Sequence, residues 1–252
     1  MKIRRTLVAV SVALNALVLA GAAWLAFGGG AAVVGKHSLA PHHEQLVSHF
    51  SAFSISAGDV VFLGDSITEG GRWEEIFPSA RTRNRGIGGE PSAGVLRRID
   101  QLAGRNAASV FLMIGTNDLS VGTDEAVIAD NVAAIVSRIR SGSPQTRVFV
   151  QSVLPRTAEF RARVESLNAR LAAVAAREGA DFIDLYPRFL DPADGSIRDD
   201  LSNDELHLLG AGYQVWRGRI AALVEESAAL SSTPENWRSW PAPRIRGEHR
   251  SS

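Results

Sequence analysis

The sequence contains no cysteine, and this absence excludes several kinds of chemistry. Without thiols the chain has no disulfide, no thiol nucleophile and no thiolate metal site, and it cannot carry a lipid on an N-terminal cysteine. An excess of charge of one sign is also missing, because 27 basic residues balance 27 acidic ones. No long run of like charges and no internal repeat is present. A chain without a basic surface field is not expected to bind nucleic acid.

Metal-ligand spacings are missing as well. His42 and His43 are adjacent and have no partner ligands nearby, so we interpret them as a solvated pair. Residues Gly30–His37 (GAAVVGKH) nearly match a phosphate-binding loop, but His37 replaces the required Ser or Thr, and no core strand precedes the segment. We therefore expect neither a metal nor a cofactor.

One long apolar run is present, at the N-terminus. The basic segment 1–5 precedes residues 6–27, which carry no charge. A helix needs ~20 residues to cross a bilayer, whereas the apolar part of a cleaved signal peptide has ~7–15. We interpret residues 6–27 as a transmembrane signal anchor that places the rest of the chain outside the cytoplasm, in the periplasm or the extracellular space. Small residues such as Ala20 and Ala22 leave a cleaved signal peptide, and hence secretion, as the alternative.

Composition divides the rest of the chain into three parts. Residues 28–41 are rich in glycine and alanine and are predicted to form a linker. Residues 42–230 are long enough for one domain with a hydrophobic core. Residues 231–252 are rich in Ser, Pro and Arg and are predicted to be a disordered tail.

Strand-like and helix-like patterns alternate along the predicted domain. Short apolar segments predict strands at 60–64, at a segment that ends near Gly86, and at 109–114, 148–154 and 181–185. Apolar residues at helical spacing predict helices over 42–53, 123–140, a segment that contains 160–174, and 210–230. This alternation is typical of an α/β fold, in which helices cover both faces of a parallel sheet.

Polar motifs follow three of the predicted strands. Gly64-Asp65-Ser66 follows the first, Asn84–Gly89 closes the second, and Gly115–Asp118 follows the third. Asp204–His207 precedes the last helix. Ligands of open α/β sheets bind outside the carboxyl ends of the strands, so we expect these motifs to meet at one edge.

Ser66 is the candidate nucleophile of this edge. A hydroxyl is a poor nucleophile at neutral pH and needs a base, and His207 is the only histidine inside the predicted core of the domain. Asp204, three residues earlier, can orient the imidazole. Attack on a carbonyl creates an oxyanion, for which the main-chain N–H groups of Gly89 and Ser66 and the side-chain amide of Asn117 are candidate donors.

Four sequence blocks together resemble the SGNH hydrolase family, also called GDSL esterases. The blocks are Val61–Gly70 (VFLGDSITEG), Asn84–Gly94 (NRGIGGEPSAG), Ile114–Leu119 (IGTNDL) and Asp204–Tyr213 (DELHLLGAGY). The N-x-G-I-G-G run and the Leu154-Pro155-Arg156 segment are most similar to the branch of platelet-activating-factor acetylhydrolases. The resemblance spans roughly residues 43–224.

The resemblance implies a fold and a set of roles. The fold is a flavodoxin-like, three-layer α/β/α sandwich with a five-stranded, mainly parallel sheet. Ser66 would be the nucleophile, Asp204 and His207 would complete the triad, and Gly89 and Asn117 would be oxyanion donors. Glu90-Pro91 departs from the Asp-Thr that is common in the family, and Pro91 lacks an N–H beside the predicted oxyanion hole. The Gly-x-Ser-x-Gly elbow of α/β-hydrolases is absent, which disfavours that fold.

These observations predict a serine ester hydrolase that acts on a small-molecule, carbohydrate or lipid acyl ester. A short acyl group of the acetyl type is the leading hypothesis. Lysophospholipid or thioester cleavage on longer chains, and acyl transfer to a sugar, are alternatives. A non-catalytic module that binds a surface polysaccharide is the alternative from another class. The sequence leaves the oligomeric state open.

Overall fold

The structure is a computed structural model that describes residues 15–21, 23 and 40–232. The predicted anchor at 6–27 and the predicted linker at 28–41 lie largely outside these residues, and so does the predicted tail at 231–252 apart from its first two residues. No helix in the described part of the chain is long and apolar enough to cross a bilayer.

A five-stranded parallel sheet forms the centre of the unit that begins at Phe50. The strands are β1 (Val60–Gly64), β2 (Thr82–Gly86), β3 (Ser109–Met113), β4 (Arg147–Gln151) and β5 (Asp181–Ile183). They lie in the order β2-β1-β3-β4-β5, and every neighbouring pair is parallel. This confirms the predicted parallel α/β architecture. From β1 the chain passes to β2 at one edge of the sheet and then returns to β3 on the other side of β1. The direction in which strands are added therefore reverses between β1 and β3.

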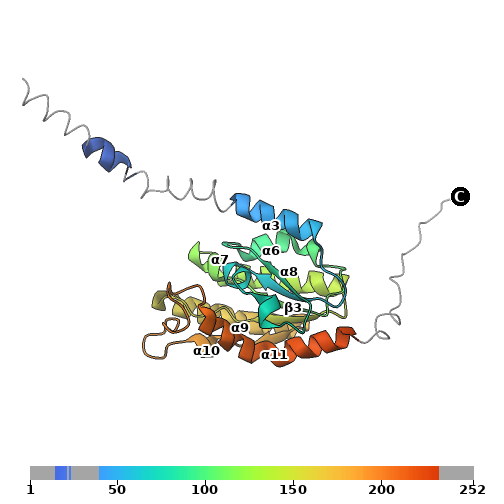
Figure 1. The fold of residues 1–252 in the computed structure, drawn as a ribbon. Helices are drawn as coiled ribbons and strands as arrows, with labels where there is room; N and C mark the ends of the chain where they lie inside the picture. The colour runs from blue at the N-terminus through green and yellow to red at the C-terminus, as the bar shows by residue number, and fades with distance from the viewer. Residues whose placement is uncertain (1–14, 22, 24–39, 233–252) are drawn as a thin grey trace, which may run out of the picture. The chain divides into compact units, whose positions relative to one another are not determined.

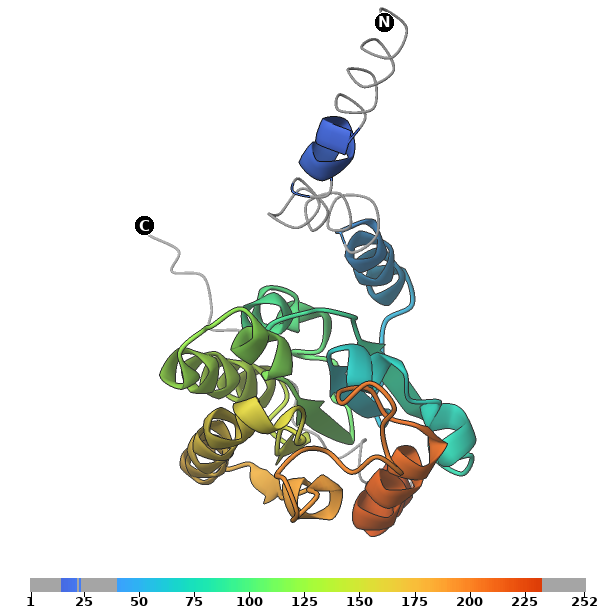
Figure 2. The same ribbon diagram turned by 90° about the vertical axis from the view of Figure 1, so that its left-hand side faces the viewer.

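Helices connect the strands and cover the sheet. The long helices of this unit are α8 (Glu125–Gly142), α9 (Arg161–Glu178) and α11 (Gly210–Ser232). Another long helix, α3 (Ala40–Ala52), precedes β1 and belongs mostly to the unit that ends at His49. The short ones are α4 (Ser66–Glu69), α5 (Trp73–Ile76), α6 (Ser92–Arg97), α7 (Thr116–Ser120) and α10 (Tyr186–Phe189). Two 3₁₀ turns, η3 (Ile99–Gln101) and η4 (Ala158–Phe160), lie in the same unit. Figure 1 shows their arrangement, and Figure 2 shows α8 and α9 on one side of the sheet and α11 on the other.

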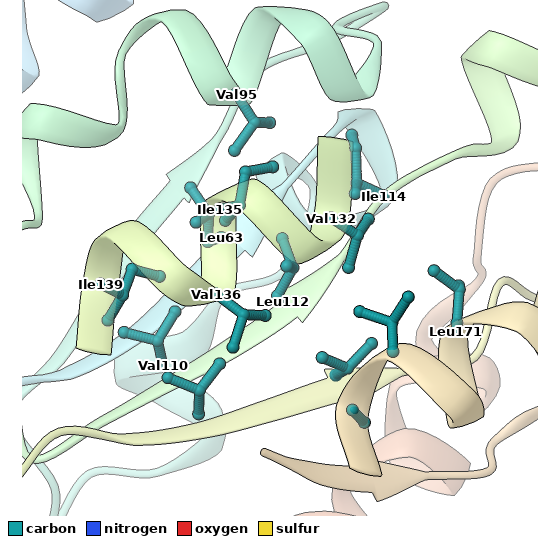
Figure 3. Close-up of a cluster of buried hydrophobic side chains, with 14 of the residues drawn as sticks. Leu63, Val95, Val110, Leu112, Ile114, Val132, Ile135, Val136, Ile139 and Leu171 are labelled. Carbon is teal, nitrogen blue, oxygen red and sulfur yellow. The ribbon is translucent and has the colours of Figure 1, made fainter. Parts of the chain in front are cut away.

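The two faces of the sheet have different cores. Aliphatic strand residues face α6, α8 and α9, and Figure 3 shows this cluster around Leu112 and Val136. The other face is aromatic: Phe62, Phe111 and Phe149 lie side by side on β1, β3 and β4, with ring centroids 5.3 and 4.6 Å apart. Trp73 stacks on Phe62 at 3.8 Å, and Trp216 of α11 meets the Trp73 ring edge-on at 4.9 Å. Burial of these large rings stabilises the α11 side of the sandwich.

Strands β3, β4 and β5 all end earlier than the sequence pattern predicts, and β4 and β5 differ the most. The predicted fourth strand reaches residue 154, but β4 ends at Gln151. Beyond it, a side chain and not a neighbouring strand bonds the main chain at Val153. The Asn168 side chain hydrogen-bonds both the N–H and the C=O of Val153, at 2.8 and 2.9 Å. The Ser152 hydroxyl accepts hydrogen bonds from the N–H groups of Leu185 and Tyr186, which ends β5 before the predicted residue 185.

Candidate active site

Ser66 lies where β1 turns sharply into α4. The turn is tight, because a Cβ added at Gly64 would lie 2.3 Å from the Met113 carbonyl oxygen. The carboxylate of Asp65 caps α4 by accepting a hydrogen bond from the N–H of Ile67 at 3.0 Å. Ser66 is the first residue of the helix, so its own N–H has no intrahelical acceptor and is available to a ligand.

The short helix α4 is held by side chains from three other elements. The Asn84 amide nitrogen lies within hydrogen-bond distance of the carbonyls of Thr68, Glu69 and Gly71, at 3.1, 2.9 and 3.0 Å. The Trp73 indole N–H donates to the Thr68 carbonyl at 2.9 Å, and the Tyr213 hydroxyl donates to the Ile67 carbonyl at 2.8 Å. A helix of four residues makes few bonds of its own, so these contacts set the direction of Ser66.

Asp204 and His207 share a tight turn before α11. One carboxylate oxygen of Asp204 accepts hydrogen bonds from the N–H groups of Leu206 and His207, at 3.1 and 2.7 Å. Glu205 between them adopts a left-handed conformation with φ 59°. The other carboxylate oxygen lies 2.7 Å from Nδ1 of His207. The imidazole and these N–H donors hold the pKa of Asp204 down at about 2.

The turn brings the imidazole to Ser66. Nε2 of His207 lies 3.0 Å from Oγ of Ser66, although 141 residues separate them in the chain. In Figure 2 the orange segment that precedes α11 lies beside the teal segments that follow β1 and β2. With its proton on Nδ1, facing Asp204, the imidazole can accept the hydroxyl proton through Nε2. The side chains of Asp204 and His207 are 49% and 48% exposed, so the site is open to a substrate from solvent.

The other two predicted oxyanion donors lie on neighbouring segments. A Cβ added at Gly88 would lie 3.9 Å from Cβ of Ser66, which places the glycine turn after β2 beside the serine. Gly89 has φ 72°, a conformation that favours glycine, and it is exposed. Asn117 is the second residue of α7, and its side-chain amide donates to the Glu90 carbonyl at 3.1 Å. The two residues therefore follow β2 and β3, the strands on either side of β1, next to the point where the strand order reverses.

A buried acid that sequence reasoning did not single out lies directly behind the serine. Asp65 is 1% exposed, and burial raises its pKa to about 7 despite its hydrogen bond to Ile67. His207 lowers this pKa, whereas Asp118 and Glu90 raise it by repulsion. Asp118 in turn accepts hydrogen bonds from the N–H and the hydroxyl of Ser92, at 2.8 and 2.6 Å.

Other supporting residues were also missed from the sequence, although several lie inside the quoted motifs. Asn84 belongs to the N-x-G-I-G-G run, and Tyr213 closes the last block. Their roles become apparent only from the contacts with α4. Within the part of the chain that the structure describes, no group of three or more histidine or acidic side chains is arranged to hold a metal ion.

Comparison with known proteins gives the family. Residues 62–215 match the GDSL-like Lipase/Acylhydrolase family. Over 165 residues the chain is 32% identical to platelet-activating factor acetylhydrolase IB subunit alpha1 of Pongo abelii, which covers 62% of this chain and 70% of the relative. A GDSL-like lipase from Bacteroides thetaiotaomicron is 25% identical and has a TM-score of 0.65, covering 73% of this chain and 98% of that one.

A second solved structure shares the fold. It is a protein from Streptococcus pneumonia described as a platelet activating factor, with a TM-score of 0.71 and 24% identity, and it covers 78% of this chain and 99% of its own. A family match that spans more than half of the chain, together with the shared five-stranded α/β/α fold, is decisive. The chain therefore belongs to the GDSL-like Lipase/Acylhydrolase family and is an ester hydrolase.

Proposed function

We propose that this protein removes a short acyl group, of the acetyl class, from an alcohol through an acyl-enzyme formed on Ser66. The observation that carries the proposal is the continuous contact from Asp204 through His207 to Ser66, at 2.7 and 3.0 Å. A carboxylate, an imidazole and a hydroxyl in this order make a serine nucleophilic.

The first half of the reaction forms the acyl-enzyme. Oγ of Ser66 attacks the ester carbonyl while Nε2 of His207 takes its proton. Asp204 keeps the imidazole in the required orientation and stabilises its positive charge. The oxyanion is held by the N–H groups of Ser66 and Gly89 and by the side-chain amide of Asn117.

The second half releases the acid. When the tetrahedral intermediate collapses, the C–O bond to the leaving alcohol breaks and His207 returns its proton to that alcohol. Water then attacks the acyl-enzyme, again with His207 as base, and the Ser66 oxygen leaves with the proton. Bonds and protons balance without a cofactor or a redox partner.

The acetyl preference is supported by the relatives. The curated proteins at 32% identity are named as acetylhydrolases of platelet-activating factor. Hydrolysis of longer chains, as in lysophospholipids or thioesters, and transfer of the acyl group to a sugar remain outcomes that substrate assays distinguish.

The N-terminal segment supports a tethered location for the domain. An uncharged run at 6–27 that follows basic residues would anchor the chain with the hydrolase outside the cytoplasm. A protein of full mass in membranes washed with carbonate would support the anchor. A shortened protein in the soluble fraction would instead support cleavage and secretion.

The deciding experiment treats the purified full-length protein with a fluorophosphonate and locates the adduct by peptide mass. Hydrolysis of nitrophenyl acetate and of a long-chain nitrophenyl ester is measured beside it. We expect labelling at Ser66, faster turnover of the acetate, and a loss of ~10⁴-fold or more in kcat for Ser66→Ala. Full turnover by a clean Ser66→Ala preparation would exclude the mechanism. A folded protein with neither labelling nor turnover would favour a polysaccharide-binding module, and preference for the long ester would reassign the substrate class.

A further inference from the structure

Glu90 lies between the two oxyanion donors outside Ser66 and contacts the segments of both. Its main-chain N–H donates to the Ile87 carbonyl at 3.2 Å and so closes the turn that contains Gly89. Its main-chain carbonyl accepts the hydrogen bond from the Asn117 amide at 3.1 Å. A displacement of Glu90 would therefore move the Gly89 N–H and the Asn117 amide together.

The side chain of Glu90 is fixed by a buried ion pair. Its carboxylate is wholly buried, and the partner Arg98 side chain is 4% exposed. Nε of Arg98 lies 3.0 and 2.9 Å from the two carboxylate oxygens, and Nη2 also contacts the carboxylate. The same Nη2 donates to the Arg85 carbonyl of β2 at 2.8 Å. Arg98 therefore connects Glu90 to the strand from which the glycine turn emerges.

The surroundings leave this pair little freedom to move. Gly94 provides the room for the carboxylate, because a Cβ there would lie 2.5 Å from Cγ of Glu90. The centroid of the Phe50 ring lies 5.6 Å from Cζ of Arg98. A close-packed ion pair in a low-dielectric interior keeps its geometry because no water can replace either partner.

Stability alone is a poor explanation for such a pair. Burying two charges costs desolvation energy, and apolar residues of similar size usually serve a core equally well or better. Here one member of the pair, Glu90, is itself the residue whose main chain joins the segments of the two proposed donors.

We infer that Glu90 and Arg98 are positioning residues that hold the Gly89 N–H and the Asn117 amide at the distance the oxyanion requires. The inference rests on the proposed function, because it assigns a purpose to donors that act in that reaction. Donors fixed in advance stabilise the transition state without reorganising, whereas donors on a loose turn must first be ordered. The pair should therefore raise kcat and leave substrate binding almost unchanged.

The test replaces both charges at once, with the double variant Glu90→Met/Arg98→Met, so that no unpaired charge is left buried. We expect kcat on nitrophenyl acetate to fall about 10- to 100-fold with KM within about twofold, less than the ~10²–10³-fold of losing a donor outright. The inhibition constant of an alkyl boronic acid, which mimics the tetrahedral intermediate, should rise by the same factor as kcat/KM falls. Arg98→Lys keeps the charge but not the planar guanidinium group, so its kcat should lie between those of the wild type and the double variant.

Controls separate positioning from folding. Val174→Ala, in α9 on the aliphatic core, lowers stability without touching the site and should keep kcat. A double variant that unfolds like the wild type and has wild-type kcat would overturn the inference alone. A wild type without turnover or Ser66 labelling would overturn the proposed function, and this inference with it.

Discussion

Asn117 and Glu90 are joined by a hydrogen bond from the Asn117 side-chain amide to the Glu90 main-chain carbonyl, 3.1 Å long. The bond links the segment after β3 to the segment after β2, the two strands that flank β1, which leads to Ser66. One N–H of the amide is occupied by this bond, which orients the other N–H as a free donor. The proposed oxyanion site would thus be assembled from side-chain and main-chain groups that depend on each other.

Asn117→Ala removes that donor and the bond to Glu90. We expect kcat on nitrophenyl acetate to fall ~10²–10³-fold, because the lost contact is made mainly in the transition state. The control is Asn131→Ala, which removes an amide that bonds the Ser92 hydroxyl and is not a proposed oxyanion donor, so it should cost much less. Equal losses in the two variants would contradict the role of Asn117.

The carboxyl of Asp204 should stay ionised throughout the range in which the enzyme works. Its folded pKa of about 2 lies below its ordinary value of 3.8, mainly because His207 and two N–H groups bond the charged form. A lowered pKa stabilises the fold above pH 3.8, and this contribution is lost as pH falls through about 2. A carboxyl-carbon NMR titration of native protein should show the low midpoint, and a midpoint at or above 3.8 would refute it.

The Asp65 carboxyl should make the stability of the fold depend on pH in the opposite direction. Its folded pKa of about 7 exceeds the unfolded value of 3.8, so the folded state binds the extra proton between these values. The stability it contributes is complete below pH 3.8 and is lost as pH rises to about 7. Asp65→Asn keeps the cap on α4 but does not titrate. The difference in free energy of unfolding, variant minus wild type in urea, should therefore rise across this interval, and a flat difference would show that Asp65 is not perturbed.

The turn between Asp204 and His207 should tolerate glycine at position 205 but not a β-branched residue. Glu205 has φ 59°, which costs a residue with a Cβ ~1–2 kcal/mol and a β-branched one more. Glu205→Gly should keep stability within about 1 kcal/mol and keep kcat. Glu205→Val should lower both, because the turn must shift and the imidazole with it. Urea unfolding measures the stability of the two variants, and steady-state kinetics measures their kcat. A fully active Glu205→Val would show that the turn is not strained.

Local sequence patterns were sufficient for the parallel α/β architecture. Apolar runs such as Val60–Leu63 and the spaced residues of α8 mark buried strands and amphipathic helices, because burial of one face imposes a periodicity on the sequence. The ends of β4 and β5 were predicted less well. Asn168 and Ser152 end these strands through side-chain bonds to distant main-chain groups, and no local periodicity reports such bonds.

The sequence by itself determined which residue types and motifs lie at the strand ends, and so named Ser66, Asp204, His207, Gly89 and Asn117 as candidates. Only the tertiary structure decided what surrounds them. The burial of Asp65, the three carbonyls facing Asn84 and the pairing of Glu90 with Arg98 all depend on segments that fold together. The physical reason is that strand and helix periodicity is a short-range property. The partner and solvation of a polar side chain are instead set by packing between elements far apart in the chain.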